Sequence, residues 1–99
     1  MQLTDTQWNA FQRLSSALQH IPESLLRQAS LKNPWFEPHL IQQAAGAWCA
    51  LLNRDAMDTW LKPYTASKTI KRIGIIMAGN IPMVGMHDLI SAVVTGHQV

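Results

Sequence analysis

The sequence predicts an α/β chain in which a helical N-terminal region, residues 1–65, leads into a truncated nucleotide-binding domain, residues 66–99. Two observations predict this fold class. Apolar residues recur at helical spacing through most of the first part. From residue 70 the pattern changes to a β-branched apolar run, which is typical of a strand buried in a parallel sheet. We therefore expect a β-α(-β) unit that opens near the end of the chain and is incomplete.

The first two helices are predicted from their ends. Thr4 and Gln7 have the spacing of a capping box, which predicts a helix over about residues 5–19. Pro22 suits the first position of a second, short helix. That helix is expected to end at Asn33, because the residue before a proline is driven out of the helical region.

Two further helices are expected before the change of pattern. Pro38 restarts the helical spacing, and Asn53 is a suitable cap for a fourth helix that Pro63 ends. The apolar face of the third helix consists of Leu40, Ile41, Ala44, Ala47, Trp48, Leu51 and Leu52. Residues 65–69 are small, polar and basic, so they are predicted to be a loop or hinge.

The last third of the chain predicts a strand, a helix and the start of a second strand. The strand is expected over residues 70–77, and the helix over residues 82–95 with Gly96 as its C-terminal stop. Residues 97–99 would begin the next strand of the crossover. A lone parallel strand leaves backbone N–H and C=O groups unmet, so we expect the strand around Ile75 to pair with another copy of the chain.

Composition excludes several classes of protein. Charged residues make up 14% of the chain, well below the roughly 25% of a typical soluble domain, which indicates that more protein covers part of the surface. A net charge of +2 with scattered cations does not favour nucleic acid. The longest apolar stretch is interrupted by Gly, Pro, Asn, His and Asp, which excludes a membrane span. The N-terminus has no signal-peptide pattern.

Several conspicuous side chains are expected to be structural. A single cysteine, Cys49, favours a reducing cytoplasm, and its place on an apolar helix face predicts a buried thiol. The four histidines lack metal-ligand spacing, so no metal site is expected, and His87 and Asp88 should serve helix packing or capping. The tryptophans, expected to anchor helices to one another, are Trp8, Trp35, Trp48 and Trp60.

One segment carries candidate chemistry, at the junction between the predicted strand and the helix after it. Gly79 allows a sharp turn or a close approach to a ligand, and Asn80 would place an amide donor at the carboxyl end of the strand. The glycines do not have the G-x-G-x-x-G spacing, and no P-loop is present. From the residues alone, Asn80 is equally well explained as a helix cap and as a ligand donor.

Three stretches of the sequence carry a resemblance to a known family. They read NPWFEP, DTWLKPY and IGIIMAGNIPMVGMHDLISAVVTGHQV, and together they cover most of residues 33–99. The chain resembles the acyl-CoA reductases that make long-chain aldehydes, relatives of the aldehyde dehydrogenase superfamily. The combination Ala-Gly-Asn-Ile-Pro between a predicted strand and helix is its most specific part.

The resemblance implies roles for five residues. Asn80 would donate a hydrogen bond to the oxyanion of the reacting carbonyl, a contribution of roughly 3 kcal/mol to the transition state. The residues around it would lie beside the nicotinamide of NADPH: Ala78, Gly79, Ile81 and Pro82. The superfamily has Pro and Trp where this chain has Ala and Gly, so contacts of that Trp side chain are not carried over.

The implied reaction is the reduction of a fatty acyl-CoA or another activated acyl group to the aldehyde through an acyl-cysteine intermediate. The nucleophilic cysteine would lie beyond residue 99, so these residues alone are expected to be inactive. The partner would be the remainder of the same polypeptide or other copies of it. The alternative from a different class is a small stand-alone helical protein-interaction module without catalytic activity, and the mass of the native protein distinguishes the two.

Overall fold

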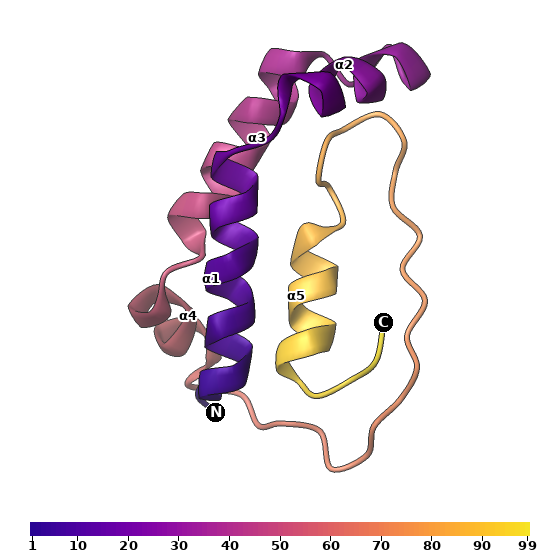
Figure 1. Ribbon diagram of the computed structural model, residues 1–99. Coiled ribbons are helices and arrows are strands. Elements are labelled where there is room, and N and C mark those ends of the chain that lie inside the picture. Colours follow the sequence, from indigo (N-terminus) through magenta and orange to yellow (C-terminus); the bar gives the residue numbers. More distant parts are fainter.

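A computed structural model describes all 99 residues, and its regular elements are five helices (Figure 1). They are α1 (Asp5–Gln19), α2 (Glu23–Lys32), α3 (Pro38–Leu51), α4 (Arg54–Leu61) and α5 (Met86–Val94). The first four occupy the first two-thirds of the chain without long interruptions, as the helical spacing predicts.

The capping residues begin these helices where the sequence predicts. The Thr4 hydroxyl accepts a hydrogen bond from the backbone N–H of Gln7 at 3.1 Å, and the Gln7 side chain accepts one from the N–H of Thr4 at 3.0 Å. The Asn53 side chain accepts from the N–H of Ala56 at 2.9 Å at the start of α4. Pro22 is the residue before the first turn of α2 rather than within it.

The helices form an elongated arrangement (Figure 1). α1 packs along α3, α2 crosses their far end, and α4 lies near the N-terminus of the chain. α5 runs alongside α1 on the side away from α3. The whole molecule extends over 42 × 26 × 19 Å.

One apolar core connects the beginning, middle and end of the chain. Its fully buried members are Leu3, Phe11, Leu52, Met57, Leu61, Ile90 and Val94. Leu61 is only 2% exposed. The predicted division into residues 1–65 and 66–99 stays a prediction, and the core draws on both parts.

The predicted α/β fold class is wrong. The structure contains no sheet: residues 70–77 are extended but form a single isolated parallel bridge, between Arg72 and Gln98. The N–H of Ile73 donates to the carbonyl of Gln98 at 2.8 Å, and the N–H of Gln98 donates to that of Lys71 at 3.0 Å. A buried parallel strand needs backbone partners along its whole length, and the apolar run has one.

Beyond this bridge the apolar run is largely open to solvent. Ile76 is fully exposed, and Met77 is 48% exposed. The β-branched pattern therefore predicts the extended backbone and not the burial, because no layer of the molecule covers its outer face. The expected pairing of this segment with another copy stays a prediction.

The start of α5 also differs from the expectation. The helix begins at Met86 rather than at Pro82, and residues 81–85 form turns. Met83 has φ 59°, a left-handed conformation that a right-handed helix cannot contain. The end agrees with the prediction, because Gly96 follows α5 with φ 92° and its N–H donates to the carbonyl of Val93.

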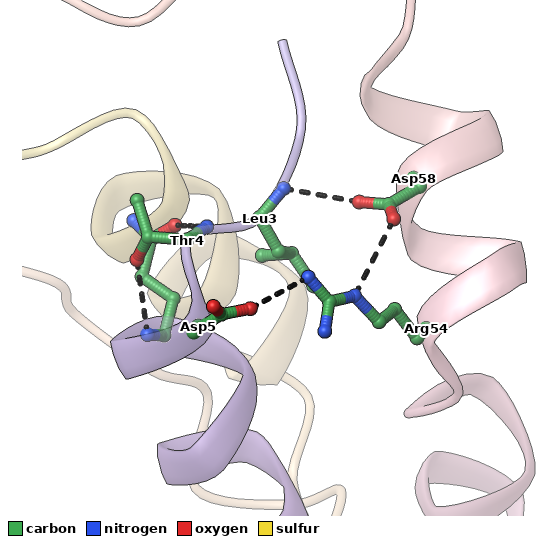
Figure 2. Close-up of polar contacts among 6 residues, drawn as sticks. Leu3, Thr4, Asp5, Arg54 and Asp58 are labelled. Atoms are coloured by element: carbon green, nitrogen blue, oxygen red, sulfur yellow. Dashed lines mark hydrogen bonds and ion pairs between the residues drawn. The ribbon is translucent and has the colours of Figure 1, made fainter.

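Polar contacts attach the N-terminus to α4 (Figure 2). The N–H of Leu3 donates to Oδ1 of Asp58 at 3.0 Å, and Oδ2 of the same carboxylate lies 3.8 Å from Nε of Arg54. Arg54 also reaches Asp5 at the start of α1, with 2.9 Å between Nη2 and Oδ1. These contacts hold the ends of α1 and α4 together while Leu3 fills the core.

None of the helices combines the length and the apolar character that crossing a membrane requires.

The core accounts for a first prediction. Leu61→Ala should lower the free energy of unfolding by about 2–5 kcal/mol, because it opens a cavity in the middle of the core. Leu31→Ala is the matched control, since Leu31 is 78% exposed and should change stability by less than about 0.5 kcal/mol. Urea unfolding followed by circular dichroism measures both variants, and equal effects would contradict this description of the core.

A second prediction concerns the contacts between α4 and the N-terminus. Asp58→Ala should destabilise the chain by about 1 kcal/mol, because the N–H of Leu3 loses its acceptor beside the core. Asp55→Ala removes an exposed carboxylate from the same helix and should cost only a few tenths of a kcal/mol. Chemical denaturation of the two variants side by side measures the difference, and its absence would exclude this role for Asp58.

Candidate functional site

The candidate site is the loop of residues 78–82, which joins the extended segment to the turns before α5. In Figure 1 it lies at the end of the molecule where α2 crosses. Ala78, Gly79, Asn80 and Ile81 are exposed, and Pro82 is partly buried. The loop therefore presents its polar and backbone groups to solvent. Two contacts hold it in place, one from Asn33 and one between the residues that flank the loop.

Asn33 supplies the first of these attachments. Its Nδ2 donates to the carbonyl of Gly79 at 2.6 Å, and its Oδ1 accepts from the N–H of Trp35 at 3.1 Å. The carbonyl of Asn33 accepts from the N–H of Phe36 at 2.9 Å, which closes the turn between α2 and α3. Two of the stretches that carry the family resemblance, NPWFEP and AGNIP, are thus in direct contact.

Close packing on the other side of the loop supplies the second attachment. A Cβ at Gly85 would come within 2.3 Å of Cγ of Met77, so the methionine side chain lies directly over the glycine. The N–H of Met86 donates to the carbonyl of Met83 at 3.1 Å. Met83 itself holds a left-handed backbone conformation, and such strained residues gather at functional sites.

The structure tests one of the two interpretations of Asn80, the helix cap. The cap residue of α5 is Gly85, and no side chain caps this helix. The interpretation of Asn80 as a helix cap is therefore wrong. The exposed amide makes no hydrogen bond within the chain, so its two N–H groups face solvent.

Gly79 leaves open space beside this amide. Apart from Gly79 itself and its two chain neighbours, no residue has an atom within 4 Å of the position that a Cβ at Gly79 would take. Neither of the two residues before Asn80, Ala78 and Gly79, carries a bulky side chain. The backbone at Gly79 is therefore open to solvent on this side.

An apolar hollow borders the loop. It has a volume of about 510 Å³, is open to solvent, and includes Pro82 and Met83 in its wall. The other apolar residues of the wall come from α1, α2, α3 and their connections: Ala17, Leu18, Ile21, Pro22, Leu25, Leu26, Ala29, Phe36 and Ile41. An apolar group of a ligand held at Asn80 would find a matching surface here.

A second, smaller hollow of about 210 Å³ lies between α3, α4 and α5. Its wall is formed by Trp48, Leu51, Leu52, Ala56, Met57, Trp60, His87 and Ile90. The rings of His87 and Trp60 lie 5.5 Å apart at their centres and are tilted by 54°. His87 thus packs against a neighbouring helix, as the sequence predicts.

Other structural expectations are confirmed only in part. Trp8, Trp48 and Trp60 pack against the core, but Trp35 is 69% exposed in the turn after α2 and anchors no helix. Cys49 is half-buried rather than buried, and its Sγ donates to the carbonyl of Ser15 at 3.4 Å. No three His, Cys, Asp or Glu side chains are grouped so that they could hold a metal ion.

Sequence reasoning missed Asn33 as part of the site. It treated this residue only as the break between two helices. The signal was present, because an asparagine that precedes proline at a helix end commonly bonds to nearby backbone through its side chain. The distance of 46 residues to Gly79 hid its actual acceptor.

In comparisons with known proteins, no family model, no curated protein and no solved structure matches this chain.

Proposed function

We propose that residues 1–99 are the N-terminal part of an acyl-CoA reductase, which reduces a fatty acyl thioester to the aldehyde with NADPH. The observation that carries the proposal is the state of Asn80. Its amide is exposed, free of intramolecular hydrogen bonds, and placed on a tethered loop next to an apolar hollow. The resemblance of the AGNIP stretch to this family supplies the chemistry that such a donor would perform.

In the proposed reaction, a cysteine thiolate beyond Val99 attacks the thioester carbonyl carbon, and the carbonyl oxygen gains negative charge. Asn80 donates an N–H to this oxygen, which lowers the energy of the tetrahedral intermediate until the CoA thiolate leaves. NADPH, when bound, supplies the hydride that reduces the resulting acyl-cysteine. Asn80 donates again as the oxygen becomes anionic, and loss of the cysteine thiolate releases the aldehyde.

Loop residues 78–82 carry no charge, so they would contact the cofactor through an accessible backbone. Ala78 has a small side chain and Gly79 has none, so the backbone is accessible, and the space beside Gly79 is open. The apolar hollow at Pro82 and Met83 suits the alkyl chain of the substrate, whose burial stabilises binding by about 0.8 kcal/mol per methylene.

Exposed apolar side chains elsewhere also support the view that these residues belong to a larger enzyme. The largest exposures are those of Leu31, Trp35, Ile70 and Ile76. More protein over these positions would remove the apolar surface from water. The single cysteine suits a reducing compartment, which supports a cytoplasmic location for the proposed enzyme.

A second candidate is a stand-alone helical protein-interaction module without catalytic activity. The observation in its favour is that the helices enclose a core of their own, with Leu61, Ile90 and Phe11 each buried to 95% or more. In this view the exposed apolar residues would face a partner protein. The two candidates differ in the mass that they require of the native polypeptide.

A third prediction follows from the role of Asn80. In the native polypeptide that carries these residues, Asn80→Ala should lower kcat for acyl-CoA reduction about 100-fold or more, because the oxyanion loses a preorganised donor. Asn9→Ala is the matched control, an exposed asparagine on α1, and should leave kcat unchanged. Oxidation of NADPH in the presence of a long-chain acyl-CoA measures turnover. Equal turnover in the two variants would remove Asn80 from the mechanism.

A fourth prediction concerns the size of the native protein. The proposed enzyme requires a species several times heavier than 11.1 kDa, because the catalytic cysteine and further residues that bind the cofactor must be present. Intact-mass analysis of the protein isolated from its source cells measures this. A native species of 11.1 kDa would refute the enzyme and leave the interaction module as the function.

A further inference from the structure

Asn33 occupies a rigid position at the end of α2. It is the C-terminal cap residue of this helix, and its backbone N–H donates to the carbonyl of Ala29 at 2.9 Å. Its carbonyl and its Oδ1 both accept hydrogen bonds from the following turn, from Phe36 and Trp35. The side chain therefore projects from a frame that is fixed on both sides.

The remaining polar group of Asn33, its Nδ2, is directed at the loop that carries Asn80. The hydrogen bond to the Gly79 carbonyl, at 2.6 Å, is the one hydrogen bond that residues 78–82 make with the rest of the chain. The next attachments along the chain are the packing of Met77 on Gly85 and the turn at Met83. Between these points the position of the loop depends on Asn33.

The bonded atom has a direct geometric connection to Asn80. The Gly79 carbonyl and the Asn80 N–H belong to the same peptide unit, which is planar. A hydrogen bond to the Gly79 carbonyl therefore restricts the rotation of this peptide plane, which also contains the N and Cα atoms of Asn80. A loop without this contact would be free to rotate that plane, and the side-chain amide would move with it.

Asparagine suits this task because one side chain must accept and donate at the same time. Its Oδ1 accepts from Trp35 while its Nδ2 donates to Gly79. An aspartate would keep the acceptor and lose the donor, and it would place a negative charge against the Gly79 carbonyl. An alanine would lose both contacts.

We propose that Asn33 is a positioning residue of the reductase, which holds the Gly79–Asn80 peptide so that the Asn80 amide meets the oxyanion. This inference rests on the proposed function, and it adds a residue from the helical N-terminal part to a site that the family resemblance assigns only to the loop. Asn33 itself does not touch substrate or cofactor. Its effect is confined to the orientation of Asn80.

The fifth prediction tests this role with Asn33→Asp, which keeps the acceptor for Trp35 and replaces the donor to Gly79 with a carboxylate oxygen. In the native polypeptide, kcat should fall about 10- to 100-fold, as a small displacement of a catalytic group produces, while KM for the acyl-CoA stays within about twofold. Lys32→Ala, a change at an exposed polar position in the same turn of α2, should leave both constants unchanged. Circular dichroism of each variant verifies that the helices remain folded.

A double-mutant cycle separates positioning from a general structural effect. If Asn33 acts through Asn80, then Asn33→Asp should cause no further loss of kcat in a protein that already carries Asn80→Ala. Independent, multiplying losses in the double variant would overturn the proposal. The proposal would also be overturned if the single variant Asn33→Asp had the same kcat as a fully active wild-type enzyme.

A readout without turnover tests the contact itself. In the ¹³C-labelled 99-residue chain, the carbonyl resonance of Gly79 should shift in Asn33→Asp and remain unchanged in Leu31→Ala, because only the first removes its hydrogen bond. An unchanged Gly79 resonance in Asn33→Asp would overturn the inference. A wild-type polypeptide without acyl-CoA reductase activity would instead refute the proposed function, and the positioning role would fall with it.

Discussion

The burial of α5 against α1 and α4 is the constraint on which the rest of this structure depends. Phe11, Leu61, Ile90 and Val94 come from these three helices and meet in one core. Because α4 ends at Leu61 and α5 begins at Met86, the chain between them must leave the core and return to it. The extended segment and the candidate loop both belong to this connection between α4 and α5. Their positions depend on where α4 and α5 are buried in the core.

The return path alone would leave the loop without a defined position. A segment of this length, with a single backbone bridge at Arg72, has many available conformations. The hydrogen bond from Asn33 and the packing of Met77 on Gly85 reduce that freedom close to Asn80. The functional proposal therefore depends on contacts made by the helical part of the chain, although the candidate donor lies outside it.

In the proposed enzyme, the exposure of the Asn80 amide and the exposure of apolar side chains have the same explanation, which is coverage by further parts of the polypeptide. An oxyanion donor is most effective where water is excluded, and Asn80 is exposed in these 99 residues. Ile76, at the end of the extended segment, is fully exposed as well. Both observations are consistent with a site that is completed and desolvated by further parts of the proposed polypeptide and by its ligands.

The sequence by itself determined the four N-terminal helices and several of their caps, because helical spacing and capping by Thr4 and Asn53 act over a few residues. It also singled out Asn80. It did not determine the state of residues 70–77, since a β-branched run becomes a strand only where other strands supply its hydrogen bonds. Only the tertiary structure decided that α5 starts at Met86 and that Asn33 bonds to Gly79. Those outcomes depend on contacts between residues far apart in the chain, which no local pattern encodes.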